Sequence, residues 1–333
     1  MDVNFPTPLV LCDIGGTNTR VAAVRTPGGA MEMLRRIRTD DFPTFELALA
    51  DLCGNIGIAP RSLVLCGAGP VVGKHLTLTN AGWSLDGEAL KRHFGLAQGL
   101  LLNDFEAQAL ALPIIDETHA VVIGPDLLTD SGPRLILGPG TGLGVAALLQ
   151  TGGKFVAVPT EAGHVGFGPA NAAEEAVWLH LERAHGRHTA ESVLSGPGLG
   201  RLHQARIAAL GLVSTAKTAA EITQAALADT AGPESDTVRL FWRLVGRFAG
   251  DMAITFGATG GVTLAGGILP RIRSLADAGS FRAEFTAKQP VEELAGRIPT
   301  RLLVEADAVL SGMAAIARNP AAYAIDYRAR AWG

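Results

Sequence analysis

The chain has 333 residues, of which 48% are hydrophobic and 18% charged, and its formal net charge is −4. This composition predicts a globular protein with one large or two medium-sized domains, and it gives no support for nucleic acid or an anionic membrane as a partner. There is neither an apolar run long enough to span a bilayer nor a signal peptide at the N-terminus, and the scattered cysteines Cys12, Cys53 and Cys66 predict a reducing, cytoplasmic setting.

The first third of the chain alternates buried runs with glycine turns. Residues 9–14 and 20–24 are predicted strands joined by the turn Gly15-Gly16-Thr17-Asn18. Further buried strands are expected within SLVLCGAGPVVG and GLLLND, and a helix over residues 105–112. Asn103 and Asp104 therefore stand where a strand gives way to a helix.

The rest of the chain repeats the opening pattern and adds helices. Residues 135–137 and 143–149 are predicted strands around a glycine turn, which suggests two related halves. GGVTLAGGILPRI reads as strand, glycine turn and helix. Strands alternate with helices, so the fold class is α/β. A boundary near Pro113 and a returning C-terminal helix predict domains of residues 1–113 plus 304–333 and of residues 114–303. The other expected helices cover residues 173–185, 236–256 and 306–318.

DIGGTNTR is a candidate phosphate-binding turn. The backbone N–H groups of Gly15 and Gly16 and the hydroxyl of Thr17 suit an anion, although an ordinary hairpin turn explains the glycines equally well. Asp13, at the end of the strand, could hold Mg²⁺ through water. No Gly-Lys-Ser/Thr follows, so this is not a Walker loop.

Two later glycine turns could complete a nucleotide site. GPGTGLG contains Gly140, Thr141 and Gly142, and the following VAALL reads as a strand, which disfavours the dinucleotide-binding pattern. Two Gly-Thr hairpins in one chain are better explained as two sides of one polyphosphate site. Gly266 and Gly267 either allow close helix–sheet packing or form a flat shelf for a purine or ribose.

TEAGHVGFGP and ESVLSGPGLG supply Glu161, His164 and Glu191. A lone histidine beside glycines is commonly structural, but polar residues in glycine-rich loops favour ligand binding. Carboxylates and an imidazole around one pocket suit a polyol, because each acceptor oxygen can take one or two hydroxyl protons. The other nearby histidines, His180, His185 and His188, are expected on the solvated face of a helix rather than around a metal.

The segment NDFEAQAL admits two interpretations. Asn103 or Asp104 could cap the helix, and Asn103-x-x-Glu106 has the form of a capping box. Alternatively, Asp104 does chemistry at the strand end. This stretch alone does not decide between them.

Together, seven stretches resemble, in order, the motifs of the bacterial ATP-dependent glucokinase family. The resemblance runs nearly end to end, and no single motif is as specific as their common order. The stretches are DIGGTNTR, LTNAGWSLD, LLNDFEA, GPGTGLGVA, TEAGH, ESVLSGPGL and GGVTLAGGILPR.

The resemblance implies a two-lobed actin-like ATPase (ribonuclease H-like) fold with a central interdomain cleft, and a homodimer. It implies phosphorylation of D-glucose by ATP with Mg²⁺, with Asp104 as general base. The residues implied to hold glucose are Asn103, Asp104, Glu161, His164 and Glu191. Those implied to bind ATP begin with Cys12, Asp13, Ile14, Gly15, Gly16 and Thr17, and the later glycine turns add Gly140, Thr141, Gly142, Gly266 and Gly267.

Two residues depart from the family pattern, which usually has glycine where this chain has Cys12 and Ala162. The related repressor/ORF/kinase family carries a cysteine-rich zinc motif that this sequence lacks, and because the sequence opens with the phosphate strand we expect no N-terminal DNA-binding domain. The alternatives are a kinase for mannose, fructose or glucosamine, and a catalytically silent sugar-sensing protein. Retention of Asp104 favours an enzyme.

Overall fold

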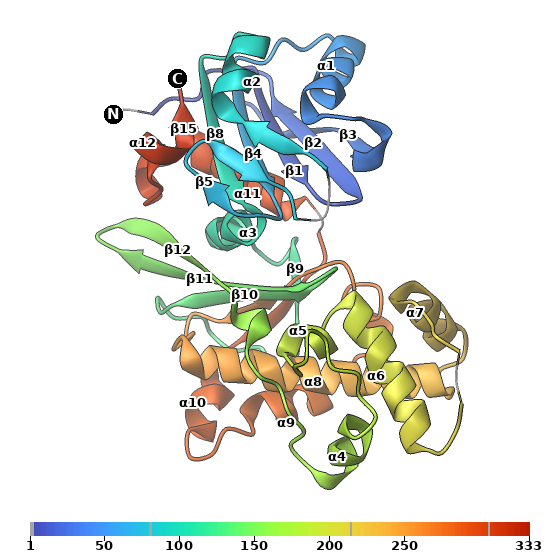
Figure 1. Cartoon of the computed structure of the whole chain (residues 1–333). Helices are drawn as coiled ribbons and strands as arrows, with labels where there is room; N and C mark the ends of the chain where they lie inside the picture. Colours follow the sequence, from blue (N-terminus) through green and yellow to red (C-terminus); the bar gives the residue numbers. More distant parts are fainter. Residues whose placement is uncertain (1–2, 80–81, 214, 306) are drawn as a thin grey trace. The chain divides into compact units, whose positions relative to one another are not determined.

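The structure, a computed structural model, describes residues 3–79, 82–213, 215–305 and 307–333 (Figure 1). The chain divides into two compact units. Unit 1 comprises Met1–Asp116, Leu148–Val158 and Glu305–Gly333, and unit 2 comprises Glu117–Ala147 and Pro159–Val304. Among the described residues, no helix combines the length and the apolar character that crossing a membrane requires.

A six-stranded sheet forms the centre of unit 1. Its order is β15 (Ala331–Trp332), β8 (Gln98–Asn103), β4 (Ser62–Gly67), β1 (Leu9–Ile14), β2 (Asn18–Val24) and β3 (Glu32–Arg38). Strands β1, β4 and β8 run parallel, and Ile14, Gly67 and Asn103 lie at one register level. The carboxyl ends of these three strands therefore meet at one edge of the sheet.

Helices cover both faces of this sheet, which explains why β1, β4 and β8 are nearly continuous apolar runs. Helices α1 (Phe45–Ile56) and α2 (Gly87–Phe94) pack on one face in a shared hydrophobic core. Figure 1 shows α11 (Ala308–Arg318) on the other side. There α11 approaches α3 (Asp104–Ala111) closely, since a Cβ at Gly312 would lie 2.3 Å from that of Ala111. A small sheet of β5 (Val71–Val72), β6 (His75–Thr77) and β7 (Ser84–Asp86) completes the unit.

The second six-stranded sheet has the order β12 (Lys154–Thr160), β11 (Leu143–Thr151), β10 (Arg134–Pro139), β13 (Val262–Leu264), β14 (Thr300–Leu303) and β9 (Ala120–Val122). Strands β10, β13 and β14 are parallel, so their carboxyl ends also share an edge. The other helices of unit 2 are α4 (Ala172–Trp178), α5 (Ala190–Val193), α6 (Gly196–Ala209), α7 (Ala219–Ala228), α8 (Pro233–Thr255), α9 (Ala278–Thr286) and α10 (Glu292–Arg297).

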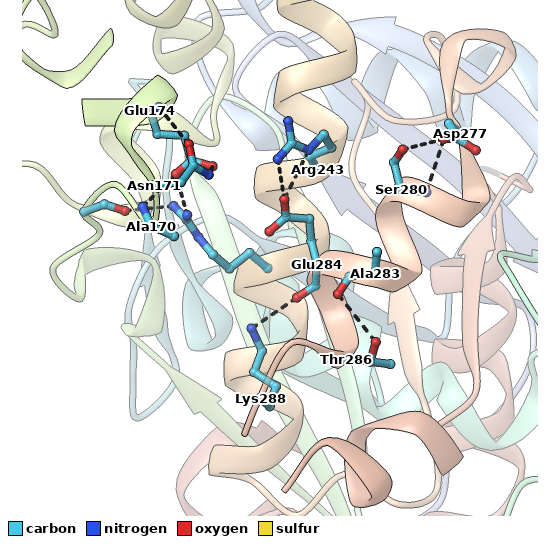
Figure 2. A network of polar contacts seen from close by, with 12 residues as sticks. Ala170, Asn171, Glu174, Arg243, Asp277, Ser280, Ala283, Glu284, Thr286 and Lys288 are labelled. Atoms are coloured by element: carbon cyan, nitrogen blue, oxygen red, sulfur yellow. Dashed lines mark hydrogen bonds and ion pairs between the residues drawn. The ribbon is translucent and has the colours of Figure 1, made fainter. Parts of the chain in front are cut away.

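Polar contacts attach α4 and α9 to the long helix α8 of unit 2 (Figure 2). Helix α8 also supplies three buried aromatic side chains to the core of this unit. Arg243 of α8 donates to Glu284 Oε1 of α9 from Nε at 3.1 Å and from Nη2 at 2.6 Å. Asn171 caps α4 by accepting the N–H of Glu174 at 3.0 Å. Glu174 Oε2 in turn accepts a hydrogen bond from Nη1 of Arg247 on α8 at 2.5 Å, so ion pairs attach both α4 and α9 to α8.

Most expected elements are confirmed, including β1, whose bounds match the prediction, and α3. The prediction of a helix over residues 173–185 extends too far, because α4 ends at Trp178. His185 then adopts a left-handed φ of 51° in a turn closed by the Arg187 N–H on the Ala184 carbonyl. The histidines of this segment thus lie on a loop rather than on a helix, and His188 Nε2 contacts the Leu181 carbonyl oxygen at 3.0 Å.

The helix expected after Gly267 is also wrong. Only one turn forms before the 3₁₀ segment Arg273–Leu275, where the Ile272 carbonyl accepts the N–H of Leu275, three residues on, and also the indole N–H of Trp242. Helix α8 begins at Pro233, about a turn before the expected start, since proline is favoured at the first helical position. Residue 306, the expected start of the last helix, lies outside the described residues.

Candidate active site

The start of α3 resolves the two interpretations of Asn103 and Asp104. The Oδ1 atom of Asn103 accepts the N–H groups of Phe105 at 3.0 Å and Glu106 at 3.1 Å. Glu106 Oε2 in turn accepts the N–H of Asn103 at 3.3 Å. The expected capping box is confirmed with Asn103 as the cap, so Asp104 is the first helical residue and its carboxylate is not the cap.

Asp104 is partly buried at the carboxyl edge of the unit 1 sheet. The pKa of its carboxyl group is raised to about 6, mainly by burial; the backbone N–H of Phe105 opposes this rise, and the charge of Asp13 adds to it. A carboxyl group with a pKa near 6 is mostly ionised at neutral pH and remains a competent proton acceptor. The position and the pKa together suit a general base.

Asp13, near the end of β1, is paired with Arg20 of β2. Arg20 donates to Asp13 Oδ2 from Nε at 3.0 Å and from Nη2, and the Cys66 thiol donates to Oδ1 at 3.4 Å. Direct coordination of Mg²⁺ would compete with the guanidinium charge. Oδ2 already accepts two guanidinium N–H groups, whereas Oδ1 accepts the thiol and keeps a lone pair for a metal-bound water, so Asp13 fits a hydrated Mg²⁺ through Oδ1. Among described residues, no group of three or more His, Cys, Asp or Glu side chains forms a metal site.

Two hydrogen bonds from Thr39 hold the turn of residues 15–17, which we call the first glycine loop. The N–H of Gly15 donates to the Asn18 carbonyl at 3.0 Å, which closes the turn. Buried Thr39 donates its hydroxyl to the Gly15 carbonyl at 2.8 Å and its N–H to the Thr17 carbonyl at 3.0 Å. Thr39 was not predicted, because nothing in its local sequence marks a contact made over more than twenty residues.

Two residues of the expected ATP-binding segment lie in the core of unit 1. The side chains of Cys12 and Ile14 are almost fully buried in the hydrophobic cluster under α1 and α2. Only their backbone atoms can reach a ligand. The cysteine at the family's usual glycine position therefore adds packing rather than a ligand-facing group. Gly16 is partly exposed and Thr17 exposed on the loop that follows.

Residues 140–142, the second glycine loop, lie beside Gly266 in unit 2. The N–H of Gly140 donates to the Gly142 carbonyl at 2.8 Å, and the Gly140 carbonyl accepts the N–H of Gly196. Gly266 has a φ of 86°, and a Cβ there would lie 2.3 Å from the Pro139 carbonyl oxygen. A Cβ at Gly267 would meet open space, so Gly267 is not required by packing. Gly266 thus meets a packing requirement, and both glycines are exposed.

The structure brings Glu161, His164 and Glu191 together in unit 2, and we call these three residues the acid–imidazole cluster. The Nδ1 atom of His164 lies 3.3 Å from Glu161 Oε2, and Nε2 lies 3.5 Å from Glu191 Oε1. Glu191 Oε2 accepts the N–H of Leu143 at 2.9 Å. The cluster is exposed enough to meet a ligand, with His164 57% and Glu161 91% exposed.

The loop that carries His164 needs one glycine but not two. A Cβ at Gly163 would lie 2.2 Å from the Leu143 carbonyl oxygen, so only glycine fits. Ala162 opens the 3₁₀ turn Ala162–His164 with an ordinary φ, and its methyl group causes no backbone strain. In the segment LTNAGWSLD, residues 80–81 lie outside the described part, and Trp83 is buried with its indole N–H on the Phe42 carbonyl.

Solved structures with this architecture are sugar kinases. A glucokinase from an Antarctic psychrotroph is 30% identical, with a TM-score of 0.82, and the match covers 93% of this chain and 98% of that chain. A ROK family glucokinase from Streptomyces griseus, in complex with glucose and AMPPNP, shares the fold with a TM-score of 0.60 at 19% identity, over 93% of this chain and 99% of that chain. The fold is thus the actin-like ATPase fold of sugar kinases, as expected.

Sequence comparison gives the family itself. The family model Glucokinase matches residues 10–320. A glucokinase from Sinorhizobium medicae is 40% identical over 332 residues, which is 99% of this chain and 98% of the relative. The chain belongs to the glucokinase family. It is an enzyme with that family's activity, the ATP-dependent phosphorylation of glucose.

Proposed function

We propose that Asp104 is the general base in the transfer of the γ-phosphoryl group of MgATP to the 6-hydroxyl of D-glucose. The proton of the 6-hydroxyl passes to the Asp104 carboxylate as the sugar oxygen bonds to phosphorus and the bond to the ADP oxygen breaks. The observation that carries this role is the capping box. Because Asn103 satisfies the helix terminus, the Asp104 carboxylate is available with a pKa raised to about 6.

Glucose is bound, in this proposal, by the acid–imidazole cluster and by Asn103. His164 lies within 3.5 Å of a carboxylate oxygen of Glu161 and of Glu191, and the three side chains can share several sugar hydroxyls. Asn103 has both acceptor sites of Oδ1 occupied by backbone N–H groups, and its Nδ2 donates to the Gly69 carbonyl at 3.1 Å. The second Nδ2 proton is therefore the group that Asn103 would offer to a sugar oxygen.

ATP is assigned to the two glycine loops and to the surface of Gly266 and Gly267. The loops expose backbone and threonine donors suited to phosphate oxygens, and the glycine surface leaves room for adenosine. Asp13 would contact Mg²⁺ through water, and the ion would supply charge neutralisation at the phosphates. The glucose and AMPPNP bound to the Streptomyces griseus neighbour support this pair of ligands.

Homodimer assembly and a cytoplasmic location remain predictions from the family resemblance. The described cysteines Cys12, Cys53 and Cys66 are free and buried, which agrees with a reducing compartment. Sedimentation analysis at several protein concentrations would measure the oligomeric state.

A coupled assay of ADP release across glucose, mannose, fructose and glucosamine tests the proposal. We expect the highest kcat/KM with glucose, and for Asp104→Asn a fall in kcat with nucleotide binding retained. Turnover of another hexose with a higher kcat/KM would reassign the sugar. A folded Asp104→Asn protein with turnover within a few-fold of the parent rate would remove Asp104 from the mechanism.

A further inference from the structure

An ion pair links the C-terminal segment to the start of α3. Arg330 Nη1 lies 2.5 Å from Glu106 Oε1 and 2.6 Å from Oε2, so one nitrogen holds both carboxylate oxygens. The Glu106 side chain is 8% exposed. A carboxylate at this depth requires a partner, because removal of the opposite charge leaves an uncompensated buried ion.

Glu106, held by Arg330, is hydrogen-bonded in turn to Asn103. Its Oε2 atom accepts the N–H of Asn103, and its own N–H and that of Phe105 bind Asn103 Oδ1. The backbone on both sides of Asp104 is therefore fixed by one hydrogen-bonded ring. Arg330 holds the carboxylate of Glu106, the acidic residue of this ring of hydrogen bonds.

The position of Arg330 is itself firmly set. Strand β15 pairs antiparallel with β8, the strand that leads to Asn103, with Ala331 opposite Leu100 and Trp332 opposite Gly99. Trp332 is 1% exposed, and a Cβ at Gly99 would lie 2.1 Å from its ring. The indole therefore occupies space that is free only because residue 99 has no side chain. The C-terminal segment thus contacts β8 along its edge and the first turn of α3 through Arg330.

We infer that Arg330 is a positioning residue for phosphoryl transfer, acting through Glu106 and Asn103 on the direction of the Asp104 carboxylate. This inference rests on the proposed role of Asp104. A displacement of about 1 Å in a reacting group can cost on the order of 10²-fold in rate, so a ring that orients the first residue of α3 affects turnover. Among the described residues, the hydrogen bonds of Arg330 and Glu106 do not involve the glycine loops, so loss of the ion pair should leave ATP affinity unchanged.

The main test compares Arg330→Gln with Arg328→Gln. Arg328 lies on the same short helix α12 (Tyr327–Arg330) but is exposed, so it is a matched control for charge and helix content. In steady-state assays well below the melting temperature, Arg330→Gln should lower kcat by about 10- to 100-fold. KM for ATP should stay within about twofold, and Arg328→Gln should match the parent in both constants.

A second pair of variants separates positioning from stability. Glu106→Gln keeps an oxygen for the Asn103 N–H but loses the two-oxygen ion pair, so its kcat should also fall. The double variant Arg330→Gln/Glu106→Gln removes the unpaired buried charge, and its kcat should exceed that of Arg330→Gln alone. If Arg330→Gln does not fold, the kcat of Glu106→Gln decides the question.

Parental kcat in folded Arg330→Gln or Glu106→Gln would overturn the inference and leave a stabilising ion pair. If Asp104→Asn abolishes turnover in the same series, the proposed function survives that failure. If Asp104→Asn retains turnover, the proposed base is wrong, and the inference fails with it.

Discussion

Glu191 links the acid–imidazole cluster to the second glycine loop. Its Oε2 atom accepts the N–H of Leu143 at 2.9 Å, while Oε1 lies 3.5 Å from Nε2 of His164. The same carboxylate also packs against Gly142, where a Cβ would lie 2.5 Å from Oε2. A side chain assigned to the sugar is therefore also a structural partner of a loop assigned to ATP, whereas His164 has only the first role.

This difference predicts distinct effects for His164→Ala and Glu191→Ala. His164→Ala should weaken glucose binding by roughly 1–3 kcal/mol, the range for losing a buried hydrogen-bond partner, and leave ATP affinity unchanged. Glu191→Ala should weaken both, because the Leu143 N–H loses its acceptor. Glu191→Gln retains an oxygen for Leu143 and serves as the control. Calorimetry with each ligand distinguishes them, and unaltered glucose affinity in all three variants would contradict the assignment.

Thr39 provides a second prediction, on the first glycine loop. Thr39→Val removes the hydroxyl that holds the Gly15 carbonyl, so KM for ATP should rise by about 2- to 10-fold, equivalent to one hydrogen bond, with KM for glucose little changed. Thr39→Ser should restore the parent value. Ser62→Ala is the matched control, since Ser62 also donates a buried hydroxyl to a backbone carbonyl in unit 1, that of Pro6 at 2.8 Å. An equal rise in KM for ATP in Ser62→Ala would show a general loss of stability instead.

The loop before His164 should respond very differently at its two small residues. Gly163→Ala should displace the loop, because the new Cβ would lie 2.2 Å from the Leu143 carbonyl, and KM for glucose should rise at least tenfold if the chain folds. Ala162→Gly should be mild, with a stability loss of up to about 1 kcal/mol from added unfolded-state freedom. Any kinetic change should affect KM for glucose more than KM for ATP. Parental glucose kinetics in Gly163→Ala would show that the loop does not bind the sugar.

Local patterns predicted much of this fold and of the site. The β1 strand and the Asn103 capping box follow from short-range apolar runs and a four-residue signal, and both are present. The residues that hold the site were not predictable in the same way. Thr39 reaches Gly15 across 24 positions and Arg330 reaches Glu106 across 224. Such pairs depend on strand order, which no local pattern contains.

The failed helix predictions have the same origin. Residues 268–272 have helical spacing, but the chain continues as a 3₁₀ turn, and the Ile272 carbonyl also accepts the indole N–H of Trp242 across 30 positions. The glycine-rich loops marked Glu161, His164 and Glu191 as candidate polyol-binding residues, and the family resemblance then implied glucose as their ligand. The geometry of the cluster, with His164 placed between two carboxylates, required the structure.

The raised pKa of Asp104 predicts the pH dependence of turnover. A general base must be ionised, so kcat should fall as pH decreases through about 6, the pKa that burial gives this carboxyl group. An unperturbed aspartate would place this limb near pH 4 instead. Measurement of kcat from pH 4.5 to 8 at saturating glucose and ATP, within the range where the fold is stable, locates the limb. A limb near pH 4 would show that the carboxyl group is more solvated than the structure indicates.

The same pKa predicts that Asp104 opposes folding when it is charged. A folded-state pKa of about 6, above an unfolded value near 4, means that its contribution to stability is fully present below about pH 4 and is lost as pH rises through 6. Asp104→Asn removes the charge at every pH. Because the residue is only partly buried, the variant should be more stable than the parent at pH 7.5 by on the order of 1–2 kcal/mol, with little difference near pH 4.

Urea unfolding of both proteins at the two pH values, paired with kcat on the same preparations, completes the test. All other titrating groups are common to the two proteins, so the change in their stability difference with pH reports on residue 104. The expected combination is a variant that is more stable at pH 7.5 and slower in turnover by on the order of 10²–10⁴-fold. A stability difference that does not change with pH would show that the Asp104 carboxyl group titrates normally. Its role as a base with a raised pKa would then have to be abandoned.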